Sequence, residues 1–161
     1  MRSCNVSIVS RNRWRIALLA VLAFGALPLS AVAEPADAVY AIAAKVVNAI
    51  NKGDAKTISA LVAPNVAVVD DFAPFAFPSF DVWSSSFDRM AKANNITDPV
   101  ITITKSPFIA VAGSAAYAPL PTTFTFKQDG KSMTQRGLLV FRFAKRASGW
   151  LVTSVTWGRS S

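Results

Sequence analysis

The segment "AINKGDAKTISALVAPNVAVVDDFAPF", residues 49–75, carries the local signals that decide the fold of this chain. Gly53 suits the position just after a helix end, because glycine adopts the left-handed backbone conformation found there. Asp54 then suits the N-cap of a second short helix over residues 54–63. Pro64 cannot continue that helix. The segment therefore predicts two consecutive helices before the first strand.

The same segment ends in a strand and an acidic pair. Residues 65–70, "NVAVVD", are rich in β-branched side chains and predict a short strand. Asp70 and Asp71 close the strand and open onto a loop of Phe, Ala and Pro, where Pro74 prevents a regular ladder. These carboxylates belong either to a strand-end turn or to a site with acid–base chemistry.

Two longer helices are predicted on either side of this segment. Residues 35–52 repeat apolar side chains at spacings of three and four, which forms one apolar face of a helix: Val39, Ile42, Ala43, Val46 and Ile50. Residues 80–93, "FDVWSSSFDRMAKA", follow Ser79 and have a similar amphipathic pattern.

The remaining chain predicts strands. Four β-branched and aromatic segments follow, at residues 98–106, 108–128, 131–146 and 149–157. "QDGK" and "RASG" between them are hairpin signals, because Gly accepts a positive φ. Helices followed by an antiparallel meander, without β-α-β alternation, predict an α+β domain with a curved sheet.

The N-terminal residues 1–33 predict a signal peptide. Four arginines precede the apolar run of residues 16–29, and residues 31–33, "AVA", supply small side chains for cleavage. The run is shorter than the roughly 20 residues of a membrane span; an uncleaved anchor is the alternative. We therefore expect an exported protein, periplasmic or secreted, in which residues 34–161 form one domain, with no membrane association after cleavage.

Composition excludes several classes of function. The chain has no His, so Ser-His-Asp catalysis and His-ligated metal sites are excluded, and we expect no metal and no cofactor. Cys4 is the only Cys and lies in the signal. Removing residues 1–33 leaves thirteen basic and nine acidic residues, a net charge of +4. This modest excess is dispersed and does not indicate nucleic-acid binding.

Residues 49–75, the amphipathic helix that follows them and "GLLVFRFAKRASGWLVTSVTW" (residues 137–157) together resemble the nuclear transport factor 2-like superfamily. The resemblance is to its SnoaL-like and ketosteroid-isomerase-like members and covers Ala36 to Trp157. It implies a cone-shaped α+β barrel, in which a strongly curved antiparallel sheet wraps around N-terminal helices and leaves an apolar pocket. It also favours a homodimer formed through the outer sheet face.

In the steroid isomerases of this superfamily the general base is an Asp that corresponds to Asp70. Side chains alternate along a strand, so Asp71 is expected to point away into solvent. The Tyr and the second acid that stabilise the oxyanion in those enzymes correspond to Val46 and to a position near Leu139, which lack polar groups. The resemblance thus implies a general base at Asp70 but no oxyanion donor at the two corresponding positions.

The candidate site follows from these positions. The catalytic candidate is Asp70, and no metal ligand is assigned. The ligand-binding candidates are the neighbouring acid and a set of mostly aromatic side chains: Asp71, Phe72, Phe75, Phe77, Trp83, Tyr117 and Met133. The competing interpretations are core packing for the Phe residues and, for the two acids, a turn in which one carboxylate caps backbone amides.

Polar and aromatic residues of the late strands have two interpretations each. Gln135 and Arg136 line the pocket mouth or, as strand alternation favours, point outward. Trp150 and Trp157 are seven positions apart, an odd spacing, so a regular strand places them on opposite faces. An outward Trp suits a dimer interface; the alternative is partial burial under a terminal tail.

Three functions remain open. The first is an exported domain that binds a small apolar molecule in the cone. The second is an enzyme of the isomerase, dehydratase or cyclase kind with Asp70 as general base. The third is a dimeric adaptor or assembly module that acts through the outer sheet face.

Overall fold

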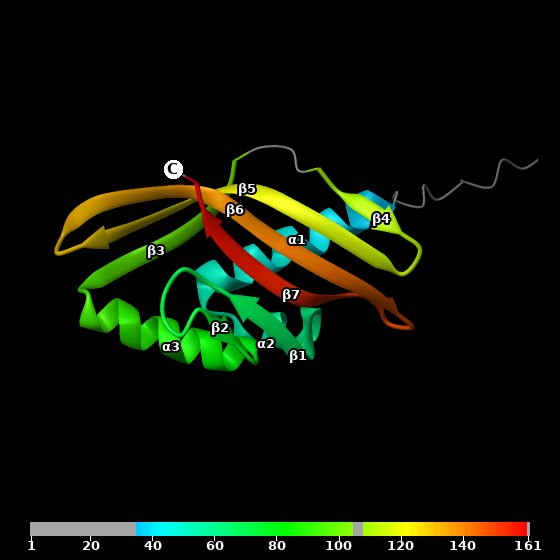
Figure 1. Cartoon of the computed structure of the whole chain (residues 1–161), viewed down its shortest axis with the longest axis horizontal. Coiled ribbons are helices and arrows are strands. Elements are labelled where there is room, and N and C mark those ends of the chain that lie inside the picture. The colour runs from blue at the N-terminus through cyan, green and yellow to red at the C-terminus, as the bar shows by residue number, and fades with distance from the viewer. Residues whose placement is uncertain (1–34, 105–107, 161) are drawn as a thin grey trace, which may run out of the picture. The chain divides into compact units, whose positions relative to one another are not determined.

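The computed structural model describes residues 35–104 and 108–160. The predicted α+β class is confirmed: within these ranges, three helices pack with a curved, mixed sheet of seven strands that does not close (Figure 1). The elements, in chain order, are α1 (Pro35–Lys52), α2 (Ala55–Leu61), β1 (Val62–Val69), β2 (Ala76–Phe77), α3 (Phe80–Ala93), β3 (Ile96–Ile103), β4 (Ala110–Ala112), β5 (Ala115–Gln128), β6 (Lys131–Arg146) and β7 (Gly149–Arg159). None of the described helices is both long and apolar enough to span a bilayer.

The sheet has one parallel pair that the meander pattern does not predict. Its strand order is β2-β1-β7-β6-β5-β3, with β4 also paired to β5. β5, β6 and β7 form the predicted antiparallel hairpins, whereas β1 pairs parallel to β7 with Val68 opposite Val155. Turn signals specify partners only for strands joined by a short loop, and β1 has no such loop to β7. The predicted strand over 108–128 is likewise two strands, separated by a turn at Gly113 (φ 57°).

A local cap explains where α2 begins, and strand pairing explains where it ends. Asp54 caps α2: its Oδ1 accepts the Thr57 amide at 3.0 Å and its Oδ2 accepts the Thr57 hydroxyl at 2.6 Å. α2 ends at Leu61, before the predicted stop at Pro64. Val62 is already extended and pairs with Val152 of β7, so tertiary pairing ends the helix before the proline does.

The core lies between α1 and the inner, concave face of the sheet. Three side chains of α1 are completely buried, Val39, Ala43 and Val46, and they join a cluster with Leu120, Phe141 and Val152 of the sheet. Asn51, near the end of α1, also binds the edge strand β3: its amide accepts the Ile101 N–H and donates to the Ile101 carbonyl, both at 2.8 Å. Packed side chains therefore occupy the part of the sheet that α1 covers.

A β-bulge in β7 changes which side chains face this core. Arg142 pairs with Ser154 while Phe143 pairs with Val152, so Thr153 has no register partner on β6. The extra residue reverses the alternation. Trp150 is therefore buried and Trp157 packs against the same core. The expectation that the two indoles face opposite sides of the sheet is wrong, and neither supplies an outward Trp.

Candidate functional site

Asp70 lies at the end of β1 on the core side. Val66 and Val68 are buried, whereas Ala67 and Val69 are exposed, and Asp70 continues the buried series as a half-buried residue. Its carboxylate reaches α3, where the Trp83 indole Nε1–H donates to Oδ2 at 2.7 Å. A side chain from a separate element thus orients this carboxylate.

The second oxygen of Asp70 has a local role. Oδ1 accepts the backbone N–H of Asp71 at 2.7 Å, and the Asp70 amide donates to the Phe75 carbonyl at 3.0 Å across the loop. The carboxylate therefore caps a backbone amide, as the turn interpretation requires, and is also held by Trp83. The two oxygens of this carboxylate thus have different partners, one within the turn and one on α3.

Burial raises the pKa of the Asp70 carboxyl above its ordinary value of 3.8. The hydrogen bonds from the Trp83 indole and the Asp71 amide stabilise the charged form and oppose this effect, while the nearby negative charge of Asp71 adds to it. The net result is a carboxyl group that binds a proton more tightly than one in water does.

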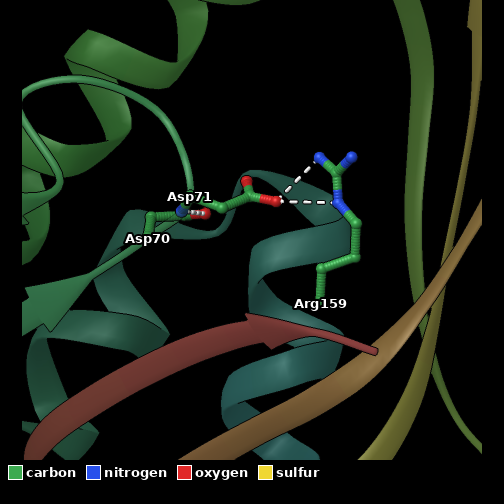
Figure 2. Close-up of polar contacts among 3 residues, drawn as sticks. All are labelled: Asp70, Asp71 and Arg159. Atoms are coloured by element: carbon green, nitrogen blue, oxygen red, sulfur yellow. Dashed lines mark hydrogen bonds and ion pairs between the residues drawn. The ribbon is translucent and has the colours of Figure 1, made fainter. Parts of the chain in front are cut away.

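Asp71 lies on the other side of the chain and is ion-paired rather than simply solvated. One of its oxygens, Oδ2, accepts from Arg159 at the end of β7, at 3.0 Å from Nε and 2.7 Å from Nη2 (Figure 2). Both side chains are partly exposed. The pair joins the β1–β2 loop to the last strand, 88 positions away in the chain.

An aromatic cluster surrounds Trp83. We define it by seven rings, each of which contacts at least one other ring of the set: Phe72, Phe77, Phe80, Trp83, Phe87, Phe124 and Phe126. Trp83 stacks on Phe87 with ring centroids 5.6 Å apart, and Phe87 meets Phe72 at 6.1 Å and Phe124 at 6.3 Å. Phe72, Trp83, Phe87 and Phe124 are only half-buried. The cluster thus presents ring surface that the core does not cover.

Of the predicted ligand-binding residues, the structure brings Phe72, Phe77 and Trp83 into this cluster. Phe75 is 59% exposed, with a left-handed backbone (φ 70°). Tyr117 is 44% exposed and pairs with Arg142 on the outer face, so it lies across the sheet from Asp70. Met133 is 41% exposed and is the cross-strand partner of Phe126, at the border of the cluster.

Sequence reasoning missed Phe124 and Phe126 as members of this cluster. Alternation within "FTF" (residues 124–126) puts both rings on one face of β5 and was the signal that could have found them. Gln135 is the cross-strand partner of Phe124 and therefore lies on the inner face. The outward position that strand alternation favours for Gln135 is wrong. Arg136 points outward as favoured, opposite Thr123.

The positions that correspond to the oxyanion donors of the steroid isomerases are apolar and buried. Val46 has no exposed surface and Leu139 is 5% exposed. Neither can donate a hydrogen bond to a developing oxyanion. Within the described ranges, no three metal-ligating side chains come together either.

A surface groove of about 490 Å³ lies between the C-terminal half of α3 and the start of β3. Its walls are formed by eight residues: Phe87, Asp88, Ala91, Lys92, Asn95, Ile96, Thr97 and Pro99. Phe87 belongs to both the groove and the aromatic cluster. Phe87 therefore connects the groove to Trp83, the residue whose indole binds Asp70.

Comparison with solved structures identifies the fold as that of the nuclear transport factor 2-like proteins. A nuclear transport factor 2-like superfamily protein from Salmonella enterica serovar Typhimurium is 17% identical to this chain. The two structures have a TM-score of 0.67 over 79% of this chain and 92% of the Salmonella chain. The S. rosetta CaMKII hub is 21% identical, with a TM-score of 0.67 over 80% of this chain and 98% of its own.

A putative ketosteroid isomerase from Shewanella frigidimarina is 20% identical, with a TM-score of 0.61 over 78% of this chain and 98% of its own. No protein-family model and no curated protein matches the sequence. The similarity therefore defines the fold class, which hosts unrelated functions.

Proposed function

We propose that the domain binds a small apolar molecule between α3 and the inner face of the sheet. The observation that carries this proposal is the half-buried carboxylate of Asp70, which Trp83 orients beside an incompletely buried aromatic cluster. Aromatic rings left partly in water contribute free energy when a ligand covers them. The carboxylate supplies the single polar contact that fixes the orientation of such a ligand.

Binding can be tested with the neutral fluorophore N-phenyl-1-naphthylamine. We expect its emission to rise with the wild-type protein and its affinity to fall in Phe87→Ala, because Phe87 joins the groove to the cluster. Tyr117→Ala removes an aromatic ring from the opposite face and serves as the matched control. Equal affinities in the two variants, or no binding by the wild type, would contradict the proposal.

Catalysis with Asp70 as general base is the alternative function at the same site. A carboxylate whose pKa is raised by burial is a better base for a carbon acid than a solvated one. Val46 and Leu139 supply no oxyanion donor, and for this reason we rank binding ahead of isomerase, dehydratase or cyclase chemistry. If Asp70→Asn retained fold and probe affinity but lost a measured turnover, the order would reverse.

Assembly of subunits is a second candidate function and rests on the outer face of the sheet. Four exposed apolar or aromatic side chains lie on this face, each on a different strand: Val69, Val100, Tyr117 and Leu138. Apolar surface of this kind commonly marks a protein contact, and similarity to the CaMKII hub favours the same reading. A homodimer should dissociate in Leu138→Glu but not in Val82→Glu, an exposed apolar position on α3; light scattering that reports a wild-type monomer would contradict it.

We also propose that the protein is exported. The predicted signal peptide, residues 1–33, lies outside the described residues, so the proposal depends on the sequence of this segment. The full chain, expressed in a bacterium with a periplasm, should yield a periplasmic or secreted product. Its mass should be that of a chain that begins at Glu34. Ala33→Asp should block cleavage at this point. A cytoplasmic product that keeps all its N-terminal residues would contradict export.

A further inference from the structure

The two carboxylates at the end of β1 differ in their charge balance. Arg159 directs both of its short contacts to Asp71. Asp70 accepts hydrogen bonds from the neutral Trp83 indole and a backbone amide, and among the described residues it forms no ion pair. The negative charge of Asp70 is therefore hydrogen-bonded but not neutralised by a cation.

A ligand that covers the aromatic cluster also removes water from this carboxylate. Taking a charge out of water is costly unless an opposite charge or strong donors replace the lost hydration. A purely apolar ligand supplies neither, whereas a ligand with a positive nitrogen offsets the cost directly. Desolvation thus selects for a cation among ligands of similar shape.

The surrounding rings favour the same sign of charge. Faces of Trp and Phe rings carry negative potential and attract organic cations within about 6 Å of their centroids. Trp83, whose indole N–H binds Asp70, contacts Phe80, at 4.8 Å, and Phe87, at 5.6 Å, so the carboxylate adjoins a group of three rings. The carboxylate and the cluster therefore act together on a positive ligand.

We propose that the ligand class of this site is an organic ammonium with an apolar body. Its nitrogen would lie against the Asp70 carboxylate and its apolar part against the aromatic cluster. This inference rests on the proposed binding function and deepens it by specifying charge.

Two probes of similar shape test the charge: 2-phenylethylamine, which is a cation at neutral pH, and 2-phenylethanol, which is neutral but still a hydrogen-bond donor. Displacement of N-phenyl-1-naphthylamine by each should show the amine binding at least about tenfold more tightly to the wild type. Asp70→Asn should abolish this preference, and Asp71→Asn, which removes the acid that Arg159 already neutralises, should preserve it.

The wild type alone provides a second measurement that does not depend on a variant folding. The preference for the amine should decline as pH falls and Asp70 becomes protonated. Equal affinity of amine and alcohol in the wild type, or a preference that survives Asp70→Asn, would overturn the inference and leave the binding function in place. Failure of the fluorophore and both probes to bind would remove the two together.

Discussion

The indole nitrogen of Trp83 on α3 lies 2.7 Å from Oδ2 of Asp70 at the end of β1. Thirteen positions separate the two residues in the chain, and the contact joins the helix to the strand end where the fold carries its candidate site. It orients a carboxylate that a regular strand end would leave to solvent. The same bond stabilises the charged form of Asp70 and so limits the effect of burial.

Trp83→Phe should remove this bond while keeping an aromatic ring. We expect a loss of about 1–2 kcal/mol in the free energy of unfolding, because the acceptor is charged and partly buried. The pKa of Asp70 should rise further, which a carboxyl-carbon NMR titration would detect. In an Asp70→Asn background the same substitution should cost less; an equal cost in both backgrounds would show that the bond contributes nothing.

The raised pKa of Asp70 predicts a pH-dependent contribution to stability. The folded state binds the proton more tightly than the unfolded state, whose carboxyl titrates near 3.8. Above its folded-state pKa, Asp70 therefore lowers the stability of the folded protein. This penalty disappears as pH falls from the folded-state pKa to the unfolded-state pKa.

Urea denaturation of the wild type and Asp70→Asn should show this pH dependence. Relative to the Asn variant, the wild type should become less stable as pH rises from about 3 to about 7. A difference that does not change with pH, or that changes in the opposite direction, would contradict the pKa direction.

Gly137 of β6 should not tolerate a side chain. A Cβ at this position would meet the Gly158 carbonyl and lie 2.7 Å from the Trp157 ring, whereas a Cβ at Gly158 would meet nothing within 4 Å. We expect Gly137→Ala to cost about 1–3 kcal/mol in chemical denaturation, the range for overpacking. Gly158→Ala, one register position away on the paired strand, should have a small effect. Similar costs for the two variants would mean that strand conformation, not contact with Trp157, dominates.

Asn51 should stabilise the folded protein by binding the edge strand of the sheet. Its side chain makes two 2.8 Å hydrogen bonds with the backbone of Ile101 and thereby satisfies part of the open edge of β3. Asn51→Ala should cost about 1–2 kcal/mol. Asn48→Ala, at an exposed position on the same helix, controls for helix propensity. Hydrogen exchange at the Ile101 amide should accelerate only in the first variant; unchanged protection would count against the contact.

Features with a local cause could be predicted from the sequence. α1 and α3 have the predicted bounds, because Gly53 and Ser79 lie at their ends and act on backbone groups of the adjacent turn. The hairpins at Gly130 and Gly149 follow from positive φ at those glycines. The fold class, and the inward position of Asp70 next to an outward Asp71, follow from order and alternation.

Features with a distant cause were decided by the tertiary structure. Parallel pairing of β1 with β7 and the bulge at Thr153 bring Trp157 into the core, and neither is encoded by a turn or a cap. Arg159 reaches Asp71 from the last strand, 88 positions away in the chain. By itself the sequence determined which segments are helix and strand and that two acids end the first strand. Only packing between remote segments decided that Asp71 pairs with Arg159 and that Asp70 binds Trp83 beside aromatic rings, since such contacts depend on where the whole chain places its partners.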